Sequence, residues 1–217
     1  MSKHPQTNQI REMIVDEAIQ LAKEKGTWEA VRFAELAKIL NLELVDVYQH
    51  FIEKDKIIDA LLDRADKAMI QAAEDVEVYH GSAHNLHALL MIWIGELNEH
   101  RIIVKQMLCS KFEIGHLHSQ LPALLRMNRT VQWWREAAKR KASFCARIFD
   151  EVGLSAIFLL TVMFWLNDES ENAKNTSEFL RNRLDDGGQV VGVLKSMFSM
   201  DFGTVRKPSC SADIIAK

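Results

Sequence analysis

Few residues in this chain can interrupt a helix. Only nine glycines and three prolines occur among 217 residues, and 48% of the residues are hydrophobic. Apolar residues recur at steps of three and four along much of the chain, which is the period of an amphipathic helix, and no segment shows a convincing strand pattern. The sequence therefore predicts an all-α fold with a sizeable core, and it excludes a disordered protein and most all-β architectures.

The N-terminal quarter predicts a helix-turn-helix. A first helix is expected over residues 10–25, with Gly26 as its C-terminal cap. Two short helices follow, one within residues 31–40 and one from about residue 44 to 50, and only a three-residue turn separates them. A long fourth helix is expected to begin near Asp55 and to lead into the rest of the chain.

The remainder predicts a second helical body after a linker around residues 80–82. Its helices are expected over residues 86–97, 101–112, from about 119, 143–166, 172–184 and 190–202. The pair Gly187-Gly188 is expected to end the helix over 172–184. The most apolar run, 152–166, is shorter than the roughly 20 residues that cross a bilayer, which favours a buried helix.

Neither the charge nor the cysteines point to a specialised class. The formal net charge is −3, so a protein of this composition needs a local basic patch to bind DNA. Three widely spaced cysteines, Cys109, Cys145 and Cys210, argue against a disulfide framework or a structural zinc site. The polar N-terminus lacks the apolar run of a secretory signal. Together these features favour a cytoplasmic location.

No motif predicts catalysis or a bound cofactor. We find no recognisable nucleophile, no glycine-rich phosphate loop and no base paired with an orienting acid. His80, His84 and His87 lie at helical spacing, but Gly81-Ser82 interrupts that helix and no cysteine or paired carboxylate completes a metal site. We therefore expect a protein that is not an enzyme and that holds neither a metal nor a cofactor.

The helix-turn-helix segments carry a distinctive set of residues. Ala34-Glu35-Leu36-Ala37 lies in the first short helix, Val47-Tyr48-Gln49-His50-Phe51 lies in the second, and Glu53-Lys54-Asp55 follows. Over about a quarter of the chain this pattern resembles the TetR family of bacterial regulators. The resemblance implies operator DNA and an apolar small molecule as partners, and a homodimer that pairs through its last long helices.

The resemblance also implies which residues contact DNA. Tyr48 and Lys54 are expected to touch phosphates, whereas Gln49 and His50 lie where base edges or backbone are approached. Arg32 is expected to contact DNA with them. A domain division follows as well, with a DNA-binding unit over 1–56, a ligand-binding and dimerisation body over 57–203, and a flexible tail over 204–217.

An alternative follows from the charges of the same unit. Residues 43–46 read Glu-Leu-Val-Asp where the family has small, hydroxylated or basic residues, and phosphates repel two carboxylates at that point. Residues 1–56 contain eight basic against ten acidic residues. In the alternative, Tyr48 and Phe51 are core residues of a three-helix unit and Lys54 is a solvated charge.

A second resemblance concerns the C-terminal part. Residues 164–170 (Phe-Trp-Leu-Asn-Asp-Glu-Ser), followed by Thr176, Phe179-Leu180 and Arg183, are similar to the TetR-fold lipid-binding family of ubiquinone biosynthesis. That resemblance implies a cavity for an isoprenoid or another lipid, an accessory function without DNA binding, and a terminal amphipathic helix that touches the membrane. Residues 189–202 are the candidate for that helix.

Aromatic residues and methionines in the second body predict an apolar ligand pocket. The expected lining residues are Trp93, Met107, Trp133, Trp134 and Phe158. The same residue types also build ordinary cores, so this alternative stays open. The function that we expect is a TetR-type DNA-binding regulator, acting as a repressor and responding to an apolar small molecule. The alternative is the lipid-binding accessory protein.

Overall fold

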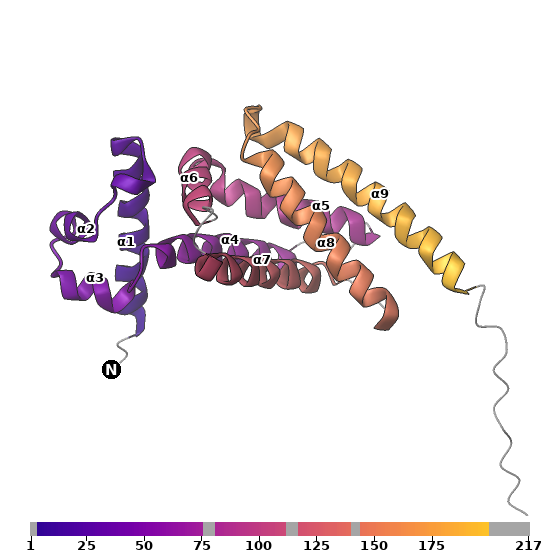
Figure 1. Ribbon diagram of the computed structural model, residues 1–217, viewed down its shortest axis with the longest axis horizontal. Helices are drawn as coiled ribbons and strands as arrows, with labels where there is room; N and C mark the ends of the chain where they lie inside the picture. Colours follow the sequence, from indigo (N-terminus) through magenta and orange to yellow (C-terminus); the bar gives the residue numbers. More distant parts are fainter. Residues whose placement is uncertain (1–3, 76–80, 112–116, 140–143, 200–217) are drawn as a thin grey trace, which may run out of the picture.

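The computed structural model describes residues 4–75, 81–111, 117–139 and 144–199. These residues form helices and turns and include no strand, so the predicted all-α fold is confirmed (Figure 1). Within the described ranges, no helix is both long and apolar enough to cross a membrane.

The N-terminal unit is a helix-turn-helix packed on a longer helix. It comprises α1 (His4–Lys25), the short η1 (Trp28–Ala30), α2 (Phe33–Ile39) and α3 (Leu44–His50). Gly26 ends α1 with a φ of 72°, a left-handed conformation that glycine adopts at little cost. Trp28, Leu36, Val47 and Phe51 are buried and form the centre of the unit. The apolar period of residues 10–25 and 31–40 therefore predicts these helices and most of their inner faces, whereas the apolar Leu44 and Val45 of α3 are exposed.

The second body contains the remaining helices. They are α4 (Asp55–Asp75), α5 (Gly81–Asn98), α6 (Arg101–Lys111), α7 (Leu117–Ala137), α8 (Phe144–Trp165), η2 (Glu171–Ala173) and α9 (Lys174–Ser199). Helix α4 leaves the N-terminal unit and runs into the body, where it packs against α5 and α7 (Figure 1). Helices α8 and α9 form a hairpin, in which α9 packs against α5 and α8 packs against α7 (Figure 1).

Three boundaries differ from the sequence-based predictions. Helix α1 begins at His4, six residues before its apolar pattern starts. The pair Gly187-Gly188 does not end a helix, because α9 continues through it to Ser199. Each glycine weakens a helix by about 1 kcal/mol relative to alanine, which the flanking turns of a long helix can offset. Of the predicted linker, residues 76–80 lie outside the described residues, and Gly81 already belongs to α5.

A cluster of aromatic side chains fills the centre of the body. Phe158 of α8 contacts Trp93 edge to face, with ring centroids 5.3 Å apart, and Trp134 lies 6.2 Å from the same ring. All three are almost completely buried. A buried indole N–H needs an acceptor, and both indoles have one. Trp93 donates to the Asp66 carboxylate and Trp134 donates to the Leu86 carbonyl.

The turn of the α8–α9 hairpin is organised around Asp168. Its carboxylate accepts hydrogen bonds from the backbone N–H of Ser170 at 2.9 Å and of Thr176 at 2.8 Å, and from the Thr176 hydroxyl at 2.6 Å. Burial alone would raise the pKa of Asp168, but these donors favour the charged form and hold its pKa at about 2. The ionised carboxylate therefore ties the start of α9 to the end of α8.

Replacing Asp168 by asparagine is expected to lower the free energy of unfolding by about 2 kcal/mol at pH 7. The folded pKa lies below the value of 3.8 for an unperturbed aspartate. This stabilisation is therefore complete above pH 4 and is lost as the pH falls toward 2, with about half gone at pH 3. Urea unfolding of wild type and Asp168→Asn at pH 7 and pH 3 measures the difference.

The neighbouring Glu169 provides the control. It is exposed, so Glu169→Gln should leave stability unchanged at both pH values. A difference between wild type and Asp168→Asn that stays constant from pH 7 to pH 3 would contradict the role given to the Asp168 charge.

Candidate functional site

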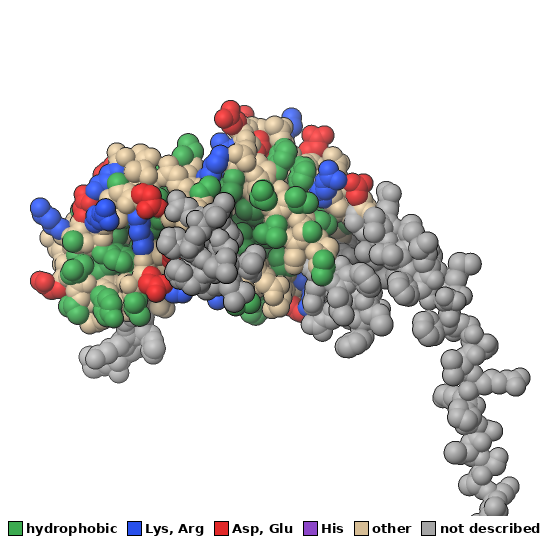
Figure 2. Space-filling model, viewed as in Figure 1, with side chains coloured by type: hydrophobic (Ala, Val, Ile, Leu, Met, Phe, Trp, Pro, Cys, Tyr) green, Lys and Arg blue, Asp and Glu red, His purple; other side chains and the backbone are tan. Residues whose placement is uncertain are grey.

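Helix α3 presents four neighbouring side chains to solvent. Leu44, Val45 and Tyr48 are 54%, 57% and 59% exposed, and Gln49 is exposed as well. Because positions four apart lie on the same side of a helix, Leu44 lies below Tyr48 and Val45 below Gln49. The opposite side is buried through Val47. We call these four exposed residues the α3 face. Hydrophobic side chains gather in the part of Figure 2 where Figure 1 places α3.

Two carboxylates define the start of α3. Glu43 is the N-cap residue, and its backbone N–H donates to the Asp46 carboxylate at 3.0 Å. Negative charge at this end also interacts favourably with the positive end of the helix dipole. The acidic residues that depart from the family pattern therefore help to begin the helix. They also remove the attraction that a free helix N-terminus exerts on phosphate.

Lys54 is already bonded within the N-terminal unit. Its ammonium donates to the Trp28 carbonyl at 2.6 Å and lies 4.5 Å from the centroid of the Trp28 ring. Burial lowers the pKa of Lys54, partly opposed by the charge of Glu29. An ammonium has three donor protons, so the bond to Trp28 leaves two for other partners.

The other expected DNA-contacting residues are distributed around the unit. Arg32 is the exposed N-cap residue of α2, and its carbonyl accepts from the first turn of that helix. His50 is half-buried at the end of α3, whereas Phe51 is fully buried. In the alternative interpretation, the assignment of Phe51 to the core is therefore correct. The assignment of Tyr48 to the core is not, because Tyr48 lies on the α3 face.

Polar contacts connect the N-terminal unit to the body, among them those of Gln106 and Arg64. The Gln106 amide of α6 accepts from the Trp28 backbone N–H at 2.7 Å and donates to the Gly26 carbonyl at 3.2 Å. Arg64 of α4 forms ion pairs with Glu12 and Asp16 of α1. A displacement of α4 or α6 therefore changes the contacts between the body and the N-terminal unit.

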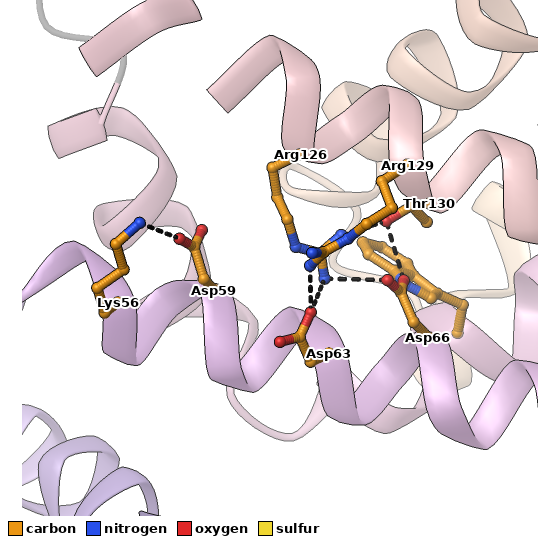
Figure 3. A network of polar contacts seen from close by, with 8 residues as sticks. Lys56, Asp59, Asp63, Asp66, Arg126, Arg129 and Thr130 are labelled. Carbon is orange, nitrogen blue, oxygen red and sulfur yellow. Dashed lines mark hydrogen bonds and ion pairs between the residues drawn. The ribbon is translucent and has the colours of Figure 1, made fainter. Parts of the chain in front are cut away.

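A buried polar network joins α4 to α7 and α5 (Figure 3). Asp66, which is only 6% exposed, accepts from the Trp93 indole and from the Thr130 hydroxyl, both at 2.9 Å, and pairs with Arg126 at 3.0 Å. The half-exposed Asp63, one turn before, pairs with Arg126 at 3.0 Å as well. The network fixes the position of α4 relative to α7 in the interior of the body.

The structure separates the five residues predicted to line a ligand pocket. Trp93, Met107, Trp134 and Phe158 are fully buried, and the rings of Trp93, Trp134 and Phe158 pack together. Trp133 lies apart from them, half exposed, beside a surface cleft of about 340 Å³ between α4 and α7. A ligand that contacts all five therefore requires this aromatic cluster to open.

Sequence reasoning did not identify the contacts of Gln106, Asp66 or Arg126. Each acts on a partner more than 50 residues away, so no local pattern marks it. Leu44 and Val45 were recognisable in the sequence as a departure from the family pattern, because two large apolar residues directly follow the turn of the helix-turn-helix.

The fold agrees closely with that of a solved structure. The crystal structure of the TetR transcriptional regulator from Nitrosomonas europaea ATCC 19718 matches with a TM-score of 0.74 and 40% sequence identity, over 83% of this chain and 99% of that chain. The chain belongs to the TetR family. Among curated proteins, no match to the sequence was found.

A second match covers a short part of this TetR-family protein. The COQ9 family matches residues 152–191, which comprise most of α8, the hairpin turn and the first two-thirds of α9. The resemblances to both families are thereby confirmed. The matched segment includes Trp165, Asp168, Thr176 and Leu180, which are buried. It also contains the hydrogen bond from Thr176 to Asp168 that ties the start of α9 to the end of α8.

Proposed function

We propose that this TetR-family protein is a DNA-binding transcriptional regulator in the cytoplasm, without enzymatic activity. The observation that carries the proposal is the α3 face, because Tyr48 and Gln49 project from the second helix of a helix-turn-helix. The 40% sequence identity to a TetR transcriptional regulator supports it. In this arrangement α3 enters the major groove, Gln49 reaches a base edge and Tyr48 contacts a phosphate.

A homodimer places two such helices on one operator. On α8, the residues Val152, Leu160, Met163 and Phe164 are large, apolar and exposed. Their spacing places them along one side of the helix, next to the hairpin partner α9. An exposed apolar stripe of this kind supports pairing of α8 with a second copy of the chain, and such pairs are commonly related by a two-fold axis.

The contacts between unit and body suggest how a ligand can act. An apolar ligand that displaces the aromatic cluster moves the helices around it, among them α4 through Asp66 and Trp93. Helix α4 and Gln106 transmit the movement to the helix-turn-helix unit. The ligand weakens DNA binding only if it binds the displaced state more tightly than the DNA-binding state.

A titration of the purified protein with the DNA that flanks its own coding region tests DNA binding. We expect a specific complex whose affinity falls steeply with salt, by about 0.9 in log K per log unit of salt for each phosphate contacted. Gln49→Ala is expected to weaken the complex by about 5- to 150-fold, since a good amide–base pair contributes about 1–3 kcal/mol. The exposed Gln132 of α7 provides the matched control, and Gln132→Ala should bind normally.

Absence of any complex at low salt would contradict the proposal and favour the second candidate, a lipid-binding accessory protein. The COQ9 match over 152–191 supports that candidate. In the predicted membrane-contacting segment 189–202, the side chains of residues 189–199 and all of residues 200–202 lie outside the described part of the chain. Mass spectrometry of an organic extract of the same preparation distinguishes the two, because only the lipid-binding protein should carry a stoichiometric isoprenoid or phospholipid.

A further inference from the structure

The first turn of α3 exposes hydrocarbon where a DNA-binding helix approaches the bases. Leu44 and Val45 are more than half exposed, and they lie on the same side as Tyr48 and Gln49. The polar side chains that flank them in this turn are the carboxylates of Glu43 and Asp46. Neither carboxylate can donate a hydrogen bond to a phosphate or to an acceptor on a base edge when it is ionised.

The major groove offers one group that suits such a surface. Thymine carries a C5-methyl group there, whereas the other groups on base edges are hydrogen-bond donors and acceptors. Apolar side chains contact this methyl group and thereby distinguish thymine from cytosine. One helical turn of about 5.4 Å spans one to two base-pair steps of about 3.4 Å. Val45 and Gln49 can therefore reach neighbouring base pairs.

We propose that Leu44 and Val45 read thymine methyl groups in the operator, beside the base pair contacted by Gln49. The inference rests on the proposed DNA-binding function and specifies the chemistry that the α3 face recognises. In each half-site, thymines are expected one or two base pairs from the base that Gln49 contacts. Affinity at these positions comes from apolar contact. The two nearby carboxylates repel phosphates, but they do not repel a methyl group.

The test replaces thymine by uracil, which lacks only the methyl group. A binding site is recovered from random duplexes with the wild-type protein and is then synthesised with deoxyuridine at every thymidine of the half-sites. Wild type is expected to bind the uracil duplex at least about tenfold more weakly, since burial of one methyl-sized group contributes about fourfold and at least two methyl groups are contacted.

Two variants show whether the α3 face causes that difference. The double variant Leu44→Ala/Val45→Ala is expected to bind the thymine and uracil duplexes within twofold of each other. Ile52→Ala removes an exposed apolar side chain that follows α3, and it should discriminate as wild type does. The double variant also controls for a change in DNA shape, because a shape effect would persist in it.

Each remaining outcome overturns the inference in a recognisable way. Equal binding of both duplexes by wild type refutes methyl recognition and leaves DNA binding intact. Unchanged discrimination in the double variant assigns the methyl effect to the DNA and not to Leu44 and Val45. Failure to recover any duplex removes the proposed function itself, and the inference with it.

Discussion

Replacing Asp66 by alanine is expected to lower the free energy of unfolding by about 3–5 kcal/mol. The change removes the acceptor of the Trp93 indole and of the Thr130 hydroxyl. Among the described residues, it leaves the half-exposed Asp63 as the one charged partner of the buried Arg126 guanidinium. A buried charge that loses its buried partner costs more than the contact itself contributed. Urea unfolding at one protein concentration measures the loss.

Asp63 provides a matched control, because it is the same residue type one turn earlier on α4. It pairs with Arg126 and with the exposed Arg129 but is itself 42% exposed. Asp63→Ala is expected to cost about 1 kcal/mol or less. Adding Arg126→Met to Asp66→Ala should recover part of the lost stability, since it removes the uncompensated charge. Equal losses for Asp63→Ala and Asp66→Ala would show that burial of the network does not matter.

Introducing glutamate at Leu160 and Met163 together is expected to convert the proposed dimer to monomers and to weaken operator binding at least about 100-fold. Both side chains lie on the exposed apolar stripe of α8. In a two-fold interface each substitution occurs twice, so four carboxylates enter one apolar contact, and burial of each unpaired charge costs several kcal/mol. A monomer contacts only one half-site and loses the affinity that the second half-site adds.

Sedimentation velocity and DNA titration measure the two effects separately. The control is Ile102→Glu, which places a carboxylate at an exposed apolar residue of α6, outside the apolar stripe of α8. This variant should stay dimeric and bind DNA normally. A wild-type protein that sediments as a monomer at micromolar concentration, or a double variant that remains dimeric, would show that the stripe on α8 is not the interface.

Local patterns in the sequence predicted much of the fold. The apolar period of residues 44–50 predicts α3 with its observed bounds, and Gly26 marks the end of α1. These predictions succeed because burial of one helix face and the conformational freedom of glycine act within a few residues. The pair Gly187-Gly188 shows the limit of the same reasoning, since α9 continues through it. Local preference is a weak constraint once a helix is long and one side of it is packed.

The same limit applies to the candidate site. Exposure of Gln49 agrees with the role predicted for it, although its contact with DNA stays a prediction. The bond of Lys54 to Trp28 and the link from Gln106 to Trp28 could not be predicted, because each joins residues 26 and 78 positions apart. Buried polar pairs such as Asp66 and Arg126 are equally hidden, since in the sequence they look like charges of solvated helix faces.

The carboxylates at the start of α3 bear on how such a regulator finds its operator in a genome. Attraction to non-specific DNA comes almost entirely from phosphate contacts. Because α3 begins with the carboxylates of Glu43 and Asp46, which repel phosphates, this attraction is weaker. Because the genome offers about a million or more competing sites, occupancy of the operator depends on the ratio of specific to non-specific affinity. A protein whose DNA-binding helix binds non-specific DNA weakly spends less time bound to other sequences. A smaller number of copies per cell therefore suffices to occupy one operator.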